Sequence, residues 1–492
     1  MSAPVPGGSG NTGGTNPPGA SVVGAVPAPP TRRGTELVLL AFVSVLVTSA
    51  LVLVEANQEQ QLTMQIVYYG LAYLALFGAA HLAVRRFAPY ADPVILPCAA
   101  LLNGIGLVFI HRIDLESAAD AAAKGQAYTA VAPKQVLWTT IALVFFVVLL
   151  VLIKDHRTLA RYGYTFGFVG LFALVLPGIL PSSLSSVNGA KVWLLFGPLS
   201  IQPGEFAKIM LIIFFAAFLV AKRDLFMAAG RKVLGLELPR PRDLGPLVFA
   251  LLISAGVLAL EKDLGNAVLV FGIVLVMLYI ATERAAWVII GVVPFLICCV
   301  VAYKLFSHVQ IRVENWLNPF WDPTNKSYQI LQALFGQVSG GIFGTGLGAG
   351  KPAIVPEANS DFILSSVGEE MGLLGLFAVL MLYFMLAARG LRSALAVRDS
   401  FGKLLGGGLA FALVWQVFVV AGGVTKLIPE TGLTSPFMSA GGSSLLANYL
   451  LVALLLRISD AARRPRGGTA SRPHLPQVPL AEAGTVLVER PS

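Results

Sequence analysis

The sequence predicts an all-α protein that crosses a membrane about twelve times. Of its 492 residues, 56% are hydrophobic and only 12% are charged. Apolar runs of roughly 18 to 25 residues recur between residues 36 and 456, and a helix of that length spans the hydrocarbon core of a bilayer, about 30 Å thick. This composition excludes a soluble globular protein.

The apolar runs give the order of the expected membrane helices. Boundaries read from a single sequence are accurate to a few residues. The expected spans are residues 36–55, 66–84, 93–111, 136–153, 163–180, 206–221, 245–261, 264–282, 286–305, 362–388, 404–424 and 436–456.

Basic residues collect at alternate ends of these spans, which predicts the orientation. With the N-terminus in the cytoplasm, most of the 35 Lys and Arg residues lie in cytoplasmic segments, as the positive-inside rule requires. We therefore expect a multi-pass plasma-membrane protein with both termini in the cytoplasm. The net charge of +9 is explained by this topology, so no nucleic-acid partner is expected.

The chain divides into one membrane domain and two tails. Residues 1–31 contain no charged or aromatic side chain and are expected to be a disordered tail. The membrane domain is expected over residues 32–459, and residues 460–492 form a second tail. Cys98, Cys298 and Cys299 lack the spacing of a zinc or redox site.

The three long connections between spans differ in composition. The basic segment 222–243 is expected in the cytoplasm, whereas 181–205 and 306–361 face the exterior. A connection as long as 306–361 is commonly functional or disordered. Its aromatic residues, including Trp316 and Trp321, favour partial burial, and we expect an amphipathic stretch at the membrane interface.

Ionisable residues near the membrane are the first candidates for function. Glu205 and Lys208 are three residues apart after Pro203, so they share one helix face and are expected to form an ion pair. Such groups often line a substrate path, although the stretch also reads as an ordinary helix start. Asp263 lies in a tight turn between two spans and is either a turn residue or part of a site.

The outer loop 306–361 is richer in chemistry. Asp322 stands between Trp321 and Pro323 and either caps a turn or acts as a partly desolvated general base. Glycines precede Lys351 at a density that would let backbone N–H groups approach a pyrophosphate, but the spacing does not match a nucleotide-binding loop. Glu369 and Glu370 lie within an apolar run, where carboxylates are costly.

Six ordered motifs between residues 188 and 444 resemble the SEDS family (shape, elongation, division and sporulation) of RodA and FtsW proteins. The chain most resembles the longer actinobacterial RodA form, because two spans precede the usual ten. Lys191 replaces the Arg that usually precedes the Trp of the first outer loop. The matching segments are Gln202–Lys208, Asp263–Gly265, Asn318–Gln329, Pro356–Ile363, Gly368–Gly372 and Pro429–Ser444.

The resemblance implies a peptidoglycan glycosyltransferase that polymerises lipid II into glycan strands during cell elongation and shape maintenance. The invariant outer-loop Asp of the family falls on Asp322, which would deprotonate the attacking hydroxyl. Lys191, Lys326, Lys351 and Arg312 are candidates for holding the leaving pyrophosphate, and a divalent cation (Mg or Mn) could share it. The rest of the expected substrate-binding set is Trp193, Glu205, Lys208, Gln329, Asp361 and Glu369.

Two other functions fit the same residues less well. A flippase for lipid-linked precursors would also bury charges such as Glu205, but would be expected to place them near the midplane and to show inverted repeats. A noncatalytic scaffold for a transpeptidase would leave Asp322 dispensable. The partner that the resemblance implies is a class B penicillin-binding protein, a single-span transpeptidase.

Overall fold

The computed structural model describes residues 31–58, 64–187, 191–196, 199–223, 231–233, 236–238 and 245–465. The predicted tails lie outside the described residues except for Thr31 and residues 460–465. The start of the first outer-loop motif, residues 188–190, lies outside them as well.

Each predicted span is matched by a helix, which confirms the all-α membrane fold. Within the described ranges, ten helices are long and apolar enough to cross a membrane. Two further apolar helices, α6 and α10, have 17 residues each. The helices that match the predicted spans are α1 (Arg33–Asn57), α2 (Met64–Phe87), α3 (Ile95–Ala123), α4 (Ala132–Leu152), α6 (Gly163–Ile179), α8 (Pro203–Ala221), α10 (Gly245–Glu261), α11 (Leu264–Thr282), α12 (Ala286–Leu305), α16 (Gly372–Ala396), α17 (Ser400–Val424) and α18 (Gly442–Arg463).

The predicted span 362–388 is divided into α15 (Ile363–Glu370) and α16. The break lies at Gly372, whose φ of +68° is favourable only for glycine. A Cβ on Gly372 would lie 2.3 Å from the backbone nitrogen of Gly344. The break therefore lets the glycine-rich loop approach the helix backbone.

The last helix is displaced toward the C-terminus relative to the prediction. It begins at Gly442 because residues 436–441 fold against the outer loop, where the N–H of Ala440 donates to the carbonyl of Asn359 at 2.8 Å. It continues to Arg463 because Asp460 is buried and accepts from the N–H of Tyr90 at 2.9 Å. Four residues of the predicted second tail are thus helical.

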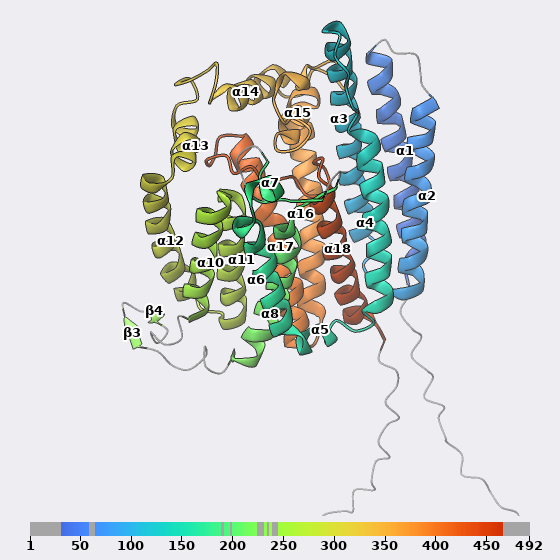
Figure 1. Cartoon of the computed structure of the whole chain (residues 1–492). Helices are drawn as coiled ribbons and strands as arrows, with labels where there is room; N and C mark the ends of the chain where they lie inside the picture. Colours follow the sequence, from blue (N-terminus) through green and yellow to red (C-terminus); the bar gives the residue numbers. More distant parts are fainter. Residues whose placement is uncertain are drawn as a thin grey trace, which may run out of the picture. The chain divides into compact units, whose positions relative to one another are not determined.

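The outer loop 306–361 is folded and contains two amphipathic helices. These are α13 (Ser307–Leu317) and α14 (Tyr328–Gly340), followed by the 3₁₀ turn η2 (Pro352–Ile354). They lie with α15 and α7 (Ser182–Ser185) at one end of the helical bundle (Figure 1). The predicted partial burial is confirmed, since Ile330 and Leu331 of α14 are buried.

Two short antiparallel hairpins were not predicted. β1 (Leu194–Phe196) pairs with β2 (Leu199–Ile201) in the first outer loop, with Leu194 opposite Ile201. β3 (Arg231–Val233) pairs with β4 (Leu236–Leu238) in the basic connection. Figure 1 places β3 and β4 at the end opposite α13 and α14, beside α12, and the short helix α5 (Thr158–Arg161) lies at the same end.

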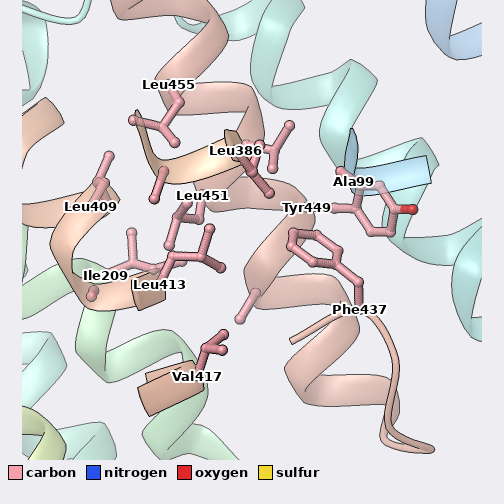
Figure 2. Close-up of a cluster of buried hydrophobic side chains, with 14 of the residues drawn as sticks. Ala99, Ile209, Leu386, Leu409, Leu413, Val417, Phe437, Tyr449, Leu451 and Leu455 are labelled. Atoms are coloured by element: carbon pink, nitrogen blue, oxygen red, sulfur yellow. The ribbon is translucent and has the colours of Figure 1, made fainter. Parts of the chain in front are cut away.

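The packed centre is formed by α3, α8, α16, α17 and α18. Figure 2 shows apolar side chains at a spacing of four residues, Leu409, Leu413 and Val417 on α17 and Leu451 and Leu455 on α18, facing one another. This spacing puts each set on one helix face. In a membrane, van der Waals packing of such faces holds helices together.

The first two helices form a hairpin against α3 and α4. Two buried polar pairs hold this hairpin. Glu36 on α1 contacts His81 Nδ1 on α2 at 2.8 Å, and Glu55 on α1 contacts His111 Nε2 on α3 at 3.2 Å. Buried carboxylates in a membrane are costly unless they are paired. The pairs therefore fix this hairpin at one position on the bundle.

Candidate active site

Charged side chains from three separate segments converge beneath α13. Arg312 extends from α13 and donates from Nη1 to the backbone carbonyl of Glu430 at 3.3 Å. At Gly432, an added Cβ would lie 3.1 Å from Arg312 Nη2 and 3.6 Å from Asp361 Oδ2. Gly432 also has a φ of +69°. Glycine at this position therefore allows the guanidinium and the carboxylate to lie on the same side of the 429–434 loop.

Among the charged groups around Arg312, Asp361 has the most clearly shifted pKa. Burial, assisted by the nearby carboxylates of Glu430 and Glu357, raises the pKa of Asp361 to about 7, although Arg312 opposes the shift. A pKa near the working pH is the value that suits a general base, which must both accept and release a proton. Asp361 lies just before α15, outside the membrane-spanning helices.

The segment that carries Asp361 is held on both sides. The side chain of Gln329 on α14 donates to the carbonyl of Pro356 at 2.9 Å. On the other side, the Ser439 hydroxyl donates to the carbonyl of Ser360 at 2.5 Å. Since rigid support is what positions a reacting group, these contacts favour a functional role for Asp361. Gln329, predicted to bind substrate, has a supporting contact here.

Asp263 is the N-cap of α11 and belongs to the same neighbourhood. Its carboxylate accepts from the backbone N–H and the side-chain amide of Asn266, at 2.9 and 2.7 Å. Burial raises the pKa of Asp263, and Arg312 partly offsets this effect. Gly265 follows, where a Cβ would lie 2.9 Å from the carbonyl of Thr431. The motif thus serves as a helix cap that brings α11 against the 429–434 loop.

Glu205 and Lys208 form the predicted ion pair within the bundle. Lys208 Nζ donates to Glu205 Oε2 at 2.5 Å and to Gln416 Oε1 at 2.8 Å, and both charged side chains are nearly inaccessible. The amide of Gln416 then donates to the carbonyl of Thr434 at 2.9 Å. This triad ties α8 to α17 and supports the loop beside Asp361. Gln416 was not predicted as part of the site, and its signal is an amide inside an apolar span.

Asp322, the predicted catalytic residue, lies in the turn between α13 and α14. Its Oδ2 accepts from the N–H of Lys326 at 3.3 Å, and its backbone carbonyl accepts from the N–H of Ser327 at 3.0 Å. Its side chain is half-buried. These contacts are those of a turn cap. Within the described ranges, no hydrogen bond or ion pair joins the Asp322 carboxylate to a cationic side chain.

Asn315 organises this turn and was not singled out from the sequence. Its Oδ1 accepts from Trp321 Nε1 and from the Ser327 hydroxyl, each at 2.7 Å. Its amide donates to the carbonyl of Lys326 at 2.9 Å. The ammonium of Lys326 lies 5.3 Å from the centre of the Trp321 ring, within the range of a cation–π contact. Lys326 therefore keeps an exposed charge at a fixed position on the loop.

The glycine-rich loop turns its backbone N–H groups toward α15. Glu370 accepts from the N–H of Gly348 at 2.9 Å, and Glu369 accepts from the N–H of Lys351 at 2.7 Å. Arg112 completes the cluster with a 2.9 Å contact from Nε to Glu370. The donors predicted to bind pyrophosphate at these two positions are thus occupied, although the Lys351 side chain is exposed. Arg112 was missed, and its signal is a basic residue directly after an apolar span.

Lys191 and Trp193 lie in the first outer loop, directly before the β1–β2 hairpin. The N–H of Lys191 donates to the carbonyl of Glu261 at 3.2 Å, and its Nζ lies 3.4 Å from the carbonyl of Leu180. The N–H of Trp193 donates to the carbonyl of Ser185 at 3.3 Å. Both contacts of Lys191 are with backbone carbonyls. In the part of the chain that the structure describes, no carboxylate pairs with its ammonium group.

The C-terminal end of α1 reaches the glycine-rich loop. The Asn57 amide donates to the carbonyl of Leu347, and the Gln58 amide donates to the carbonyl of Gly348. At Gly348, whose φ is +84°, an added Cβ would lie 3.0 Å from Asn57 Cβ. The first helix therefore contacts the loop on the side opposite Glu370.

We expect Asn57→Ala to loosen this loop without unfolding the bundle. Loss of one hydrogen bond costs about 1 kcal/mol, which corresponds to roughly fivefold faster opening. Amide hydrogen exchange of residues 345–351 measures the change. Thr48→Ala on the same helix, which removes a hydroxyl bonded to the Ser44 carbonyl, is the control, and equal exchange of the loop in both variants would contradict the contact's role.

The described residues offer no preformed metal site. No group of three or more His, Cys, Asp or Glu side chains among them is placed to hold an ion. The carboxylates around Arg312 come from separate segments and do not form such a set.

Comparison with known proteins identifies the chain's relatives. The family described as cell cycle protein, which groups FtsW, RodA and SpoVE, matches residues 92–464. The peptidoglycan glycosyltransferase RodA of Mycobacterium tuberculosis is 53% identical over 95% of this chain and 98% of that protein. The corresponding protein of Mycobacterium leprae is also 53% identical, over the same shares.

More distant relatives cover less of the chain. A probable peptidoglycan glycosyltransferase FtsW of Trichlorobacter lovleyi is 32% identical over 76% of this chain and 94% of its own length. One solved structure is described as "Structural coordination of polymerization and crosslinking by a peptidoglycan synthase complex". A chain of that structure is 25% identical to this chain, with a TM-score of 0.51, and the match covers 79% of this chain and 96% of the solved chain. The greater similarity to mycobacterial RodA confirms the predicted likeness to the longer actinobacterial form.

Proposed function

The chain belongs to the FtsW, RodA and SpoVE family and is a peptidoglycan glycosyltransferase, and from this premise we propose that it polymerises lipid II with Asp361 as the general base. The substrate is a disaccharide-peptide on a polyprenyl pyrophosphate. The acceptor hydroxyl attacks the anomeric carbon of the donor sugar, the carbon–oxygen bond to the pyrophosphate breaks, and the proton of the hydroxyl passes to a carboxylate.

The observation that carries the assignment is the position of Asp361, because an added Cβ on Gly432 would lie 3.1 Å from Arg312 Nη2 and 3.6 Å from Asp361 Oδ2. A carboxylate with a pKa of about 7 is a far better proton acceptor than one with the ordinary value near 4. Arg312 lies beside it, with a guanidinium suited to pyrophosphate oxygens. Base and cation are thus within one site, as a single displacement with an anionic leaving group requires.

Asp322 remains the alternative base predicted from the motif pattern. Its carboxylate accepts from the backbone of its own turn, and its neighbours Trp321 and Lys326 are exposed. These features support a role in shaping the loop that covers the site. We therefore place Asp361 before Asp322 as the proton acceptor.

The other predicted substrate-binding residues divide into two groups. Lys191, Lys326 and Lys351 have their charges on the outer-loop side and are proposed to attract the pyrophosphates of donor and acceptor. Trp193 and Gln329 lie on the same loops, where we propose that they contact the sugars. Glu205, Lys208 and Glu369 have their charges satisfied inside the protein and act by holding the loops around Asp361.

The proposed setting is the outer face of the plasma membrane, with both termini in the cytoplasm. Basic residues at the α5 and α16–α17 connections support this orientation. We further propose a single-span class B penicillin-binding protein as the partner that cross-links the product. The support is the similar solved chain, whose description couples polymerization with crosslinking.

Incubation of purified lipid II with the purified protein and its transpeptidase partner tests this function. We expect glycan strands and free polyprenyl pyrophosphate without a nucleotide sugar, because the donor is already activated. The control is the partner alone, which should leave lipid II intact. Movement of lipid II across vesicles without strand formation would contradict the proposal and favour a flippase.

A further inference from the structure

A cavity lies at the end of the bundle opposite the candidate active site. Its volume is about 590 Å³, within the range of ligand pockets. Residues from the end of α4, from α5, from α6 and from α8 line it. Met210 is the residue of α8 that lines it, and neither Arg312 nor Asp361 is among the lining residues, so the cavity is separate from the candidate active site. Figure 1 shows α5 at the end opposite α13.

The helix packing explains why this space is open. α6 packs on α8 and α10, whereas α4 packs on α18 and α2, so the two helices diverge after the connection at residues 153–157. Gly163 and Gly167 face α8, where added Cβ atoms would lie 2.5 Å from Ala217 Cβ and 2.6 Å from Phe214. Close packing on that side leaves the adjacent face of α6 to line the cavity together with Met210 of α8.

Most of the cavity wall is apolar, and its edge faces the lipid phase. Leu152, Leu159, Phe166 and Met210 line it, together with Val169. Leu152 has 73% of its surface exposed. Along α6 the wall extends from Tyr162 to Val169, a rise of about 10 Å, which accommodates part of an acyl chain.

The mouth of the cavity is polar, and basic residues lie in it and beside it. Lys154, Asp155 and Thr158 line it, and Arg161 follows at the end of α5. Among the residues that the structure describes, neither Lys154 nor Arg161 has a carboxylate partner, whereas the nearby Arg157 contacts Asp399 at 3.3 Å. The exposed ring of Tyr162 beside them is typical of the membrane–water interface.

We propose that this cavity binds an anionic glycerophospholipid, with one acyl chain against α6 and the phosphate facing Lys154 and Arg161. An apolar wall that ends in unpaired basic side chains complements an amphiphile with an anionic head group. Basic pockets between membrane helices on the cytoplasmic side are known to bind such head groups. The site is independent of the polymerase proposal, because none of its residues belongs to the candidate active site.

Native mass spectrometry of delipidated full-length protein tests the proposal, with phosphatidylglycerol and phosphatidylcholine as probes. Wild type should retain phosphatidylglycerol in preference to phosphatidylcholine. Each basic side chain near the surface contributes about fivefold, so Lys154→Gln with Arg161→Gln should weaken phosphatidylglycerol binding about 25-fold. Val169→Trp, which fills the wall and keeps the charges, should weaken binding of both lipids.

Arg392→Gln with Arg398→Gln is the matched control, because it removes two exposed charges, one near the end of α16 and one in the connection to α17. This variant should bind like wild type, and thermal unfolding checks that all variants are folded. Equal retention of the two lipids by wild type would overturn the proposal. The same holds if the control loses as much binding as the cavity variant, or if polyprenyl phosphate displaces phosphatidylglycerol.

Discussion

Asp361→Asn is expected to reduce lipid II polymerisation by about 10² to 10⁴-fold, the range that a general base contributes. Asparagine keeps the size of the side chain but cannot accept the proton of the attacking hydroxyl. The measurement is the rate of glycan formation by the purified complex at saturating lipid II. A loss of this size with unchanged lipid II binding separates proton transfer from substrate recognition.

Asp322→Asn is the matched variant for this comparison, because it makes the same chemical change in the same outer loop. Asparagine can still accept the N–H of Lys326, so the turn should form and activity should fall far less. Thermal unfolding of both variants checks that the fold is retained. If Asp322→Asn is inactive while Asp361→Asn polymerises, the roles of the two carboxylates are reversed.

Lys208→Ala is expected to destabilise the protein by about 3 to 5 kcal/mol, because it leaves Glu205 as an unpaired charge inside the bundle. Gln416 also loses the donor to its Oε1. The free energy of unfolding in mild detergent, or the unfolding temperature, measures the loss.

The double variant Glu205→Gln with Lys208→Met provides the control for this prediction. The double variant has no buried charge without a partner at this position, so it should be more stable than Lys208→Ala. If the two variants are equally unstable, the effect comes from lost packing and not from the buried charge.

Most of the fold could be predicted because the signal for a membrane helix is local. An apolar run of sufficient length needs no knowledge of its neighbours, and each predicted span is matched by a helix. The break before Gly372 could not be predicted in this way. It depends on the approach of Gly344, which is distant in the sequence and becomes a neighbour only in the folded chain.

The residues of the site could be named from the sequence, whereas the surroundings of each side chain could not. Asp322 and Asp361 both lie in recognisable motifs, and residue type alone does not tell which is desolvated. The pKa of Asp361 is raised first by burial and then by Glu430, while Arg312 opposes the shift, and both residues come from segments distant in the sequence. Gln416 and Arg112 were missed for the same reason, since their partners Lys208 and Glu370 lie 208 and 258 residues away.

The pH dependence of lipid II polymerisation tests the assignment of Asp361 most directly. Since its pKa is raised to about 7, the carboxyl is protonated below that pH and cannot act as a base. With Asp361 as the base, kcat/KM is expected to rise about tenfold per pH unit up to about pH 7 and then to level off. A rate that stays constant between pH 5 and 8, in protein shown to remain folded, would contradict it.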